Sequence, residues 1–435
     1  MSSAQSWTNS EGSTTDGVPR LVVKFLPSQL EVFDCPAQNV VYAKGRRSGG
    51  TTGAANRLVE LLALEPGSRH LWVDTTAQNI LKIYRMMIRP LIREIDYSWN
   101  QAGLLLEFPN GAFVQFASTT QGTNLEGWGY DYFWINEAGL VLRNSDLYYS
   151  TLVPMSLESP KARWFFFGTP KGPGLFQEFY NNGNNPDLPA WASFRHSSFV
   201  NPFVNQALVD RLSKRMPSQT FNQEFHAQFL QGLESVFLSY RKQVMPLAEL
   251  PAPVIDAHAE PLYVMGVDLA RHQDYTGVWV LRAFPGPVVG VWADRWRGMP
   301  WGSQIQKLAG ISSQFKCASM LVDATGLGAP VFEAMLQQGL PVSPVVISFS
   351  KKRSLIDALA LAFESGELSI IEHQPTIDEL DTFRRSFRSS GLEVFSAPPG
   401  GHDDMVISLA LAWELARVQS SGIGFLGTPS MFELL

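Results

Sequence analysis

Two aspartates end apolar runs in the carboxyl-terminal half of this sequence, where carboxylates of neighbouring strands can meet. The run 262–267 ends at Asp268, and the run 320–322 ends at Asp323. Carboxylate oxygens are ligands that Mg²⁺ prefers, and two such ions cleave a phosphodiester by activating water and stabilising the leaving oxygen. Each aspartate alone would also serve simply as a strand end. Together with the acidic pair Asp403-Asp404, they predict a site of metal-dependent cleavage.

An acidic pair before the last apolar segment adds to this prediction. Asp403 and Asp404 precede residues 405–415, which are apolar on nearly all sides and therefore predict a buried helix. Either residue could merely cap that helix. Strand-end aspartates and an acidic helix start, far apart in sequence, are what an RNase H-like fold gathers around two magnesium ions.

A glycine-rich stretch in the amino-terminal half has the composition of a phosphate-binding loop. It follows the apolar run 40–43 and precedes a helical pattern that ends at Pro66. Backbone N–H groups in such a turn bind phosphate, and the helix start adds a favourable dipole. The alternative is an ordinary glycine-rich turn with solvated basic residues. The nucleotide-binding candidates are Lys44, Gly45, Arg46, Arg47, Ser48, Gly49, Gly50, Thr51 and Thr52.

The loop departs from the usual motif, G-x-x-x-x-G-K-[ST], at the lysine that contacts the β- and γ-phosphates. Gly50 occupies that position, whereas Thr51 keeps the hydroxyl that contacts magnesium. Phosphoryl transfer needs positive charge on these oxygens, so another cation must replace the lysine if this protein hydrolyses ATP. Lys44 is the candidate, because its flexible stem can fold back over the loop. Arg46 and Arg47 compete for this role.

A second strand pattern ends in polar residues suited to nucleotide hydrolysis. The run 132–135 is followed by Asn136 and Glu137. In nucleotide hydrolases one acid at such a position organises magnesium, and a second residue orients the attacking water. Asn136 lacks the charge of the first acid, whereas Glu137 can still activate water. A polar pair that simply ends a strand is the alternative.

Two further polar residues could contact a nucleotide. Gln29 lies at a predicted helix start upstream of the loop, from which it could read an adenine edge. Thr169 follows the apolar run 163–167, in a small polar turn that could sense the γ-phosphate. Without the phosphate loop, these residues would be a solvated helix-start glutamine and part of an ordinary strand-ending turn.

Local patterns also predict the elements around these residues. Residues 103–108 and 112–116 flank Asn110-Gly111 and predict a β-hairpin. A β-meander is predicted to open the second domain, from residue 262 to residue 292.

Composition bounds the class of protein. The chain has 435 residues, 45% of them hydrophobic, and a net charge of −6, which describes a globular protein with enough core for two domains. This negative charge excludes a basic nucleic-acid coat, so nucleic-acid contacts would use local patches. Two cysteines are too few for a disulfide framework, and no apolar run reaches membrane-spanning length. We therefore expect a cytoplasmic protein.

The boundaries follow from proline-rich and polar stretches. The predicted parts are a disordered tail (1–20), a P-loop ATPase domain (21–245), a linker (246–261), an RNase H-like nuclease domain (262–418) and a carboxyl-terminal tail (419–435). The predicted fold class is therefore α/β in both domains.

The order of these motifs resembles the large terminase subunits of tailed bacteriophages. The resemblance rests on Gln29, the Gly-Arg-Arg-Ser-Gly loop, Asn136-Glu137-Ala138 and Gly168-Thr169-Pro170. It implies an ASCE-type ATPase in which Gln29 contacts adenine, Glu137 is the catalytic glutamate and Thr169 belongs to the coupling motif. It also implies that residues 197–232 form the helical lid that follows in this family. It also implies that Asp268, Asp323 and Asp404 bind the nuclease metals, with Asp403 as a close fourth.

The resemblance further implies a function and partners. Such a subunit packages double-stranded viral DNA with ATP and Mg²⁺, cleaves concatemeric DNA, and accepts Mn²⁺ in place of Mg²⁺. Its partners would be the small terminase subunit, the portal protein and further copies of itself in a ring. It would act in the host cytoplasm, dock transiently on the procapsid, contact no membrane and be absent from the mature virion.

Two other functions remain open from the sequence. A nucleotide-binding scaffold with an attached nuclease would bind ATP at the altered loop without hydrolysing it. A helicase-like or transposase-like enzyme is the third possibility. ATPase measurements with and without DNA and procapsid distinguish the motor from the scaffold.

Overall fold

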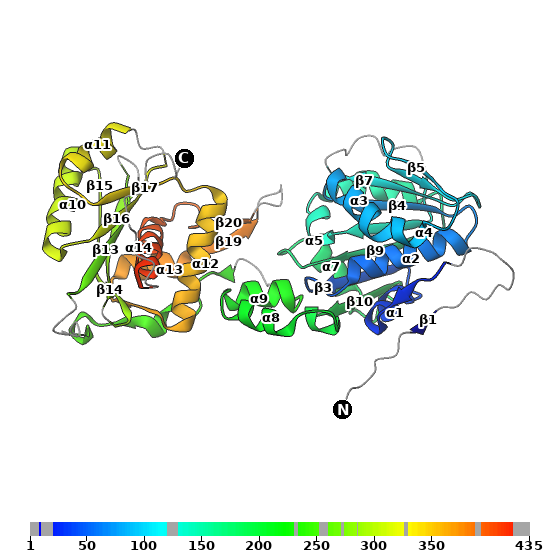
Figure 1. Ribbon diagram of the computed structural model, residues 1–435, viewed down its shortest axis with the longest axis horizontal. Coiled ribbons are helices and arrows are strands. Elements are labelled where there is room, and N and C mark those ends of the chain that lie inside the picture. The colour runs from blue at the N-terminus through cyan, green and yellow to red at the C-terminus, as the bar shows by residue number, and fades with distance from the viewer. Residues whose placement is uncertain are drawn as a thin grey trace, which may run out of the picture. The chain divides into compact units, whose positions relative to one another are not determined.

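The computed structural model forms two compact units (Figure 1). It describes residues 8–9, 21–119, 129–229, 234–251, 260–270, 274–284, 286–325, 329–387 and 393–420. The first unit contains most residues up to 232, and the second contains most residues from 233 onward.

The first unit is built on an eight-stranded sheet with the order β10-β3-β9-β8-β4-β7-β6-β5. The strands from β10 to β7 are parallel, and β6 and β5 continue the sheet in antiparallel pairs. The strands are β3 (Asn39–Lys44), β4 (Arg69–Asp74), β5 (Ser98–Asn100), β6 (Leu105–Glu107), β7 (Phe113–Ser118), β8 (Tyr132–Asn136), β9 (Arg163–Gly168) and β10 (Trp191–His196). The predicted hairpin is confirmed, since β6 pairs with β7.

Alternation of large apolar residues explains why this sheet is buried on both faces. Tyr42, Trp72 and Trp134 lie in one core cluster, while their neighbours Val41 and Leu71 lie in the other. The helices of the unit are α1 (Pro27–Phe33), α2 (Gly50–Leu64), α3 (Ala77–Ile83), α4 (Arg89–Ile92), α5 (Ala138–Val141), α6 (Val153–Ser156), α7 (Leu175–Asn182), α8 (Gln206–Ser213) and α9 (Ser218–Phe225), with π-helical turns at Tyr84–Ile88 and Leu147–Leu152 and a 3₁₀ turn at Ser198–Val200. Because parallel strands end at one edge, the residues after β3, β4, β8 and β9 come together there.

The strand order confirms the predicted class of this unit. Strand β9 lies between the glycine-loop strand β3 and the glutamate strand β8. An added strand between these two is the arrangement of ASCE-type P-loop domains.

The second unit contains a seven-stranded sheet with the order β12-β18-β15-β14-β13-β16-β17. Strands β13, β14 and β15 form the predicted antiparallel meander, and β16 joins β13 in parallel, as in an RNase H-like fold. The strands of the unit are β11 (Glu234–Ser235), β12 (Val244–Met245), β13 (Leu262–Asp268), β14 (Tyr275–Phe284), β15 (Val288–Arg297), β16 (Ser319–Asp323), β17 (Val342–Val345), β18 (Leu368–Ile371), β19 (Arg384–Phe387) and β20 (Glu393–Ser396).

The last helix of this unit packs directly on the sheet backbone. A Cβ atom at Gly266 would lie 2.0 Å from the Ser408 carbonyl oxygen, and one at Gly277 would lie 2.5 Å from that of Asp404. Only glycines permit this approach, which brings the start of α14 to the end of β13. The helices are α10 (Trp301–Phe315), α11 (Ala329–Gln337), α12 (Phe349–Ser365), α13 (Gln374–Thr382) and α14 (Asp404–Ser420), with 3₁₀ turns at Tyr240–Gln243 and Leu247–Glu249.

The division into units differs from the predicted boundary at residue 245. Strand β11 pairs with β19 and strand β12 pairs with β18, so residues from 234 to 245 belong to the second unit. In the predicted amino-terminal tail, β1 (Thr8–Asn9) pairs with β2 (Lys24–Phe25), so these two residues are not disordered. The rest of that tail, residues 230–232 of the lid, residues 252–259 of the linker and residues 421–435 lie outside the described residues.

Candidate functional site

The turn between β3 and α2 forms a cradle at the edge of the first sheet. Gly49 precedes the helix with φ 92°, and Arg47 has φ 66°, so the chain curls before Gly50 starts α2. Gly49 meets the left-handed requirement without strain. A cavity of about 750 Å³ lies over the turn, and residues 44–52, Glu137 and Thr169 are in its lining. The structure thus brings the predicted loop, glutamate and coupling residue together.

Lys44 lies over Gly50, where the usual lysine would start. Its Nζ is 3.1 Å from Glu137 Oε1, and its side chain is buried. A Cβ atom at Gly50 would lie 2.6 Å from Lys44 Cδ and 2.8 Å from Tyr42 Cε1. Gly50 therefore leaves the space that the displaced lysine fills. In this arrangement the Lys44 ammonium neutralises the candidate catalytic carboxylate.

Thr51 is linked to the end of β8 and, through it, to the end of β4. Its Oγ1 donates to Asn136 Oδ1 at 3.3 Å, and Asn136 Nδ2 donates to Asp74 Oδ2 at 2.7 Å. Burial raises the pKa of Asp74, against the opposing hydrogen bonds from Asn136 and Thr75. Sequence reasoning missed Asp74, although it ends an apolar run, because nothing local shows that β4 and β8 are neighbours.

Gln29 is buried against the loop. Its Oε1 accepts a 2.7 Å bond from the Leu26 amide, and its Nε2 donates to the Gly49 carbonyl at 2.8 Å. The side chain thus holds the turn in place. A direct contact between Gln29 and adenine stays a prediction.

The predicted lid segment (197–232) contacts the 44–52 loop through a buried glutamate. Glu224 in α9 forms ion pairs with Arg46 of the loop and with Lys171, which follows the coupling turn. Burial alone would raise the pKa of Glu224, but Lys171 and Arg46 hold it below its ordinary value. Ser198 Oγ donates to the Arg46 carbonyl at 2.6 Å, and Asn201 Nδ2 donates to the Arg47 carbonyl at 2.7 Å. Loop, coupling turn and lid are therefore connected through one carboxylate.

In the second unit, Asp268 and Asp323 end adjacent parallel strands. Val267 and Val322 are paired in the register, which places the next two residues side by side. Burial, followed by the charges of Asp323, Asp404 and Asp403, raises the pKa of Asp268 well above its ordinary value. The three other predicted carboxylates thus lie close enough to Asp268 for their charges to act on it.

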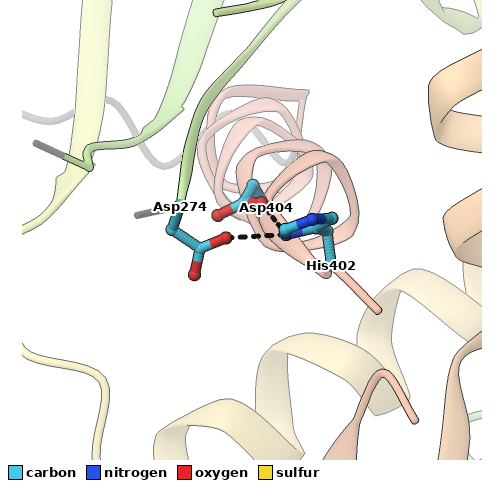
Figure 2. Close-up of side chains that lie close together, drawn as sticks. All are labelled: Asp274, His402 and Asp404. Carbon is cyan, nitrogen blue, oxygen red and sulfur yellow. Dashed lines mark hydrogen bonds and ion pairs between the residues drawn. The ribbon is translucent and has the colours of Figure 1, made fainter. Parts of the chain in front are cut away.

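Asp404 lies in a second group of ligands that sequence reasoning missed (Figure 2). His402 Nδ1 is 2.8 Å from Asp274 Oδ1 and 3.8 Å from Asp404 Oδ2. Burial, followed by Asp274, Glu379 and Asp403, raises the pKa of Asp404 to about 8. Asp274 directly precedes β14 and His402 precedes the acidic pair, so spacing alone did not single them out.

Asp403 and Asp404 face different surroundings. Asp403 Oδ2 accepts a 2.8 Å bond from Lys352 Nζ, whereas Asp404 Oδ2 is buried without a hydrogen bond in the described structure. Glu379 caps the first turn of α14 from α13 by accepting bonds from the Met405 and Val406 amides at 2.7 and 3.2 Å. This cap fixes the turn that carries Asp404.

These residues suit a divalent cation. The atoms that would bind the cation are carboxylate oxygens, and the negative charges around Asp268 repel its carboxylate. The buried Asp404 Oδ2 accepts no hydrogen bond from the described residues. Cations of the Mg²⁺ type favour such ligands and relieve their repulsion.

Among the described residues, no helix has both the length and the apolar character to cross a bilayer. The fold and the two sites define a two-domain enzyme, an ASCE-type P-loop ATPase joined to an RNase H-like nuclease.

Comparison with known proteins identifies the family. No family model matches the chain. The large terminase subunit of Thermus virus P23-45 is 27% identical over 432 residues, covering 88% of this chain and 86% of that protein. The large terminase subunit of Escherichia phage T5 is 27% identical over 222 residues, which are 50% of this chain and 49% of that protein. The chain belongs to the family of phage large terminase subunits.

Two solved structures are similar to different shares of the chain. The large terminase of a thermophilic bacteriophage covers 91% of this chain, with 99% of its own length matched, at 13% identity and a TM-score of 0.51, which supports the two-domain fold. The large terminase nuclease of thermophilic phage G20c, solved with bound magnesium, is 31% identical. The match covers 98% of that chain and 42% of this one, with a TM-score of 0.38.

Proposed function

We propose that this chain is a DNA-packaging motor subunit, which hydrolyses ATP to move double-stranded DNA into a procapsid and cleaves concatemeric DNA. The observation that carries the proposal is the 3.1 Å pair between Lys44 and Glu137 above the phosphate loop. Both side chains line one cavity, which supports a role for Lys44 in binding phosphate and for Glu137 in activating water. The carboxylate cluster of the second unit supports the cleavage activity.

ATP binding would redistribute the charges at the loop. Backbone N–H groups of residues 45–52 bind the phosphates, and Lys44 moves from Glu137 to the β- and γ-oxygens. Glu137 is then free to orient the attacking water and accept its proton. Magnesium bound with ATP neutralises charge on the same oxygens, and Thr51 is the residue that would hold it. Thr169, in the lining of the same cavity, would transmit the state of the γ-phosphate.

Residues at the end of β13, the end of β16 and the start of α14 would perform the cleavage. Asp268, Asp323 and Asp404 would hold the metal ions, and Asp403, which pairs with Lys352, would lie beside them. The bound ions supply activation of water and stabilisation of the leaving oxygen. Mn²⁺ would substitute because it accepts the same oxygen ligands.

The remaining parts of the proposal concern assembly. The curated relatives are named large terminase subunits, and such a subunit would work as a ring on the portal protein with the small terminase subunit. It would act in the host cytoplasm, dock transiently on the procapsid and be absent from the mature virion.

Glu137→Gln tests the motor function. The variant should bind ATP as wild type does and lose steady-state turnover by about two orders of magnitude or more, because a positioned proton acceptor is lost. DNA cleavage should remain, which serves as the folding control. ATPase rates would be measured with and without DNA and procapsid. Equal turnover by the two proteins contradicts the assignment of Glu137, and a wild type without turnover under all conditions favours the scaffold function.

A further inference from the structure

The phosphate site lacks a carboxylate at the place where a nucleotide hydrolase has one. Asn136 ends β8 beside Thr51, and its amide carries no net charge. A magnesium ion bound with ATP would therefore face a neutral group at this strand end. The nearest replacement lies on the adjacent strand.

Asp74 stands directly behind Asn136. Strands β4 and β8 are parallel neighbours, and Val73 pairs with Ile135, so the next residue of each strand is the polar one. Asp74 Oδ2 accepts a 2.7 Å bond from Asn136 Nδ2, and Asp74 is completely buried. Its Oδ1 accepts bonds from the Thr75 amide and hydroxyl at 2.6 and 3.2 Å.

No lysine, arginine or histidine in the described part of the chain forms an ion pair with Asp74. A buried carboxylate without a cationic partner is costly. A purely structural strand end could use asparagine, which accepts the same backbone bond without the charge.

The carboxylate also determines how the Asn136 amide is oriented. Because Nδ2 donates to Asp74, Oδ1 must point to the other side, where Thr51 Oγ1 lies at 3.3 Å. A hydrogen bond to an anion strengthens the opposite oxygen as an acceptor. The two side chains therefore present a more negative oxygen to the phosphate site than an isolated amide would.

We infer that Asp74 acts through Asn136 as a positioning residue for the magnesium ion of bound ATP, so that the two residues together replace one strand-end aspartate. This inference rests on the proposed ATP-binding function. Thr51 and Asn136 are neutral, so in this inference the negative charge that attracts the magnesium ion comes from Asp74.

An exchange of the two residues tests the inference. The affinity for a fluorescent ADP or for ATPγS would be titrated as a function of Mg²⁺ concentration in the full chain. Asp74→Asn should reduce the Mg²⁺-dependent gain in affinity about tenfold or more, because a charge-assisted hydrogen bond is lost. The exchange variant Asp74→Asn/Asn136→Asp should recover most of that gain, because one carboxylate and one amide again face each other.

Two single variants serve as controls. Asn136→Asp alone places two carboxylates in contact, so it should bind Mg²⁺-nucleotide less tightly than the exchange variant. Asp131→Asn makes the same chemical change just before the opposite end of β8, where Asp131 pairs with Arg69, and should leave the Mg²⁺ dependence unchanged. Thermal unfolding would establish that each variant is folded.

The outcomes separate the inference from the proposed function. Unchanged Mg²⁺ dependence in folded Asp74→Asn, or a folded exchange variant that gains nothing from Mg²⁺, overturns the inference alone. A wild type that binds neither nucleotide overturns the proposed function as well. If Asp74→Asn fails to fold, recovery of folding and Mg²⁺-dependent binding in the exchange variant supports the inference.

Discussion

At the scale of single residues, Gly50 and Lys44 explain each other. The Lys44 stem lies so close to Gly50 that any side chain at position 50 would contact it. The sequence suggested the displaced lysine because phosphate chemistry requires a cation and the motif position is empty. It did not show that Glu137 is the partner of Lys44 before ATP arrives, since that contact joins residues far apart in the chain.

Lys44→Ala should therefore weaken ATP binding and turnover more than Arg47→Ala does. Loss of a cation at the transferred phosphoryl group removes transition-state stabilisation, about two orders of magnitude in kcat or more. Steady-state kinetics over a range of ATP concentrations measures both effects. Turnover by Lys44→Ala at the wild-type rate would show that another cation does the work.

Gly50→Ala gives a second test of the same pair. The new methyl group should displace Lys44 and lower turnover in the wild-type background. In Lys44→Ala the same substitution should cost less, because one of its two closest contacts is gone and only Tyr42 remains. Strictly additive effects of the two substitutions would argue against this explanation. Gly50→Lys should partly restore activity to Lys44→Ala, because it returns a cation to the loop. The restoration should be incomplete, because the Tyr42 ring must move to make room for the new side chain.

At the scale of elements, the sequence predicts where strands end but not which strands lie side by side. Apolar runs that stop at Lys44, Asp268 and Asp323 mark buried strands from local pattern alone. Asp74, Glu224, Asp274 and His402 were missed as site residues because their roles depend on which strands or helices lie side by side. Pairings such as β4 with β8 join residues about 60 positions apart and leave no local signal.

The contacts of Glu224 with Arg46 and Lys171, which we call the lid clamp, should depend on pH. Its pKa is lowered in the folded protein, so its stabilising effect is present above the ordinary glutamate pKa and is lost as pH falls through the folded value. At pH 7, Glu224→Gln should destabilise the first unit by about 1–3 kcal/mol, because Lys171 and Arg46 lose their charged partner. Thermal unfolding should show a difference from wild type at pH 7 that narrows below about pH 4.5.

The surface variant Glu94→Gln is the matched control for Glu224→Gln. Glu94 is exposed, and among the described residues it forms an ion pair with the adjacent Arg93 alone, so the variant should melt close to wild type at both pH values. A difference between Glu224→Gln and wild type that is independent of pH would mean that packing, not charge, accounts for the clamp.

At the scale of the whole molecule, each unit has its own core and carries its own site. The phosphate cavity is lined by residues of the first unit, and the carboxylate cluster is formed by β13, β16 and α14 of the second. Both fold classes followed from motif order, whereas the assignment of residues 234–245 did not. Short strands such as β12 are too small to be recognised without their partner strand.

This separation predicts that the two activities can be removed one at a time. Asp268→Ala or Asp323→Ala in the full chain should abolish Mg²⁺- or Mn²⁺-dependent cleavage of plasmid DNA, because the remaining carboxylates cannot hold both ions. ATP turnover should stay at the wild-type level, since Asp268 and Asp323 lie outside the phosphate cavity. Thermal unfolding should also show no loss of stability for Asp268→Ala, because burial and the neighbouring carboxylates raise the pKa of Asp268 and make its charged form unfavourable without metal.

Glu137→Gln is the reciprocal control, with cleavage intact and turnover lost. Undiminished cutting by either aspartate variant would remove that residue from the metal site, and a parallel loss of ATP turnover would show that the two units do not work independently.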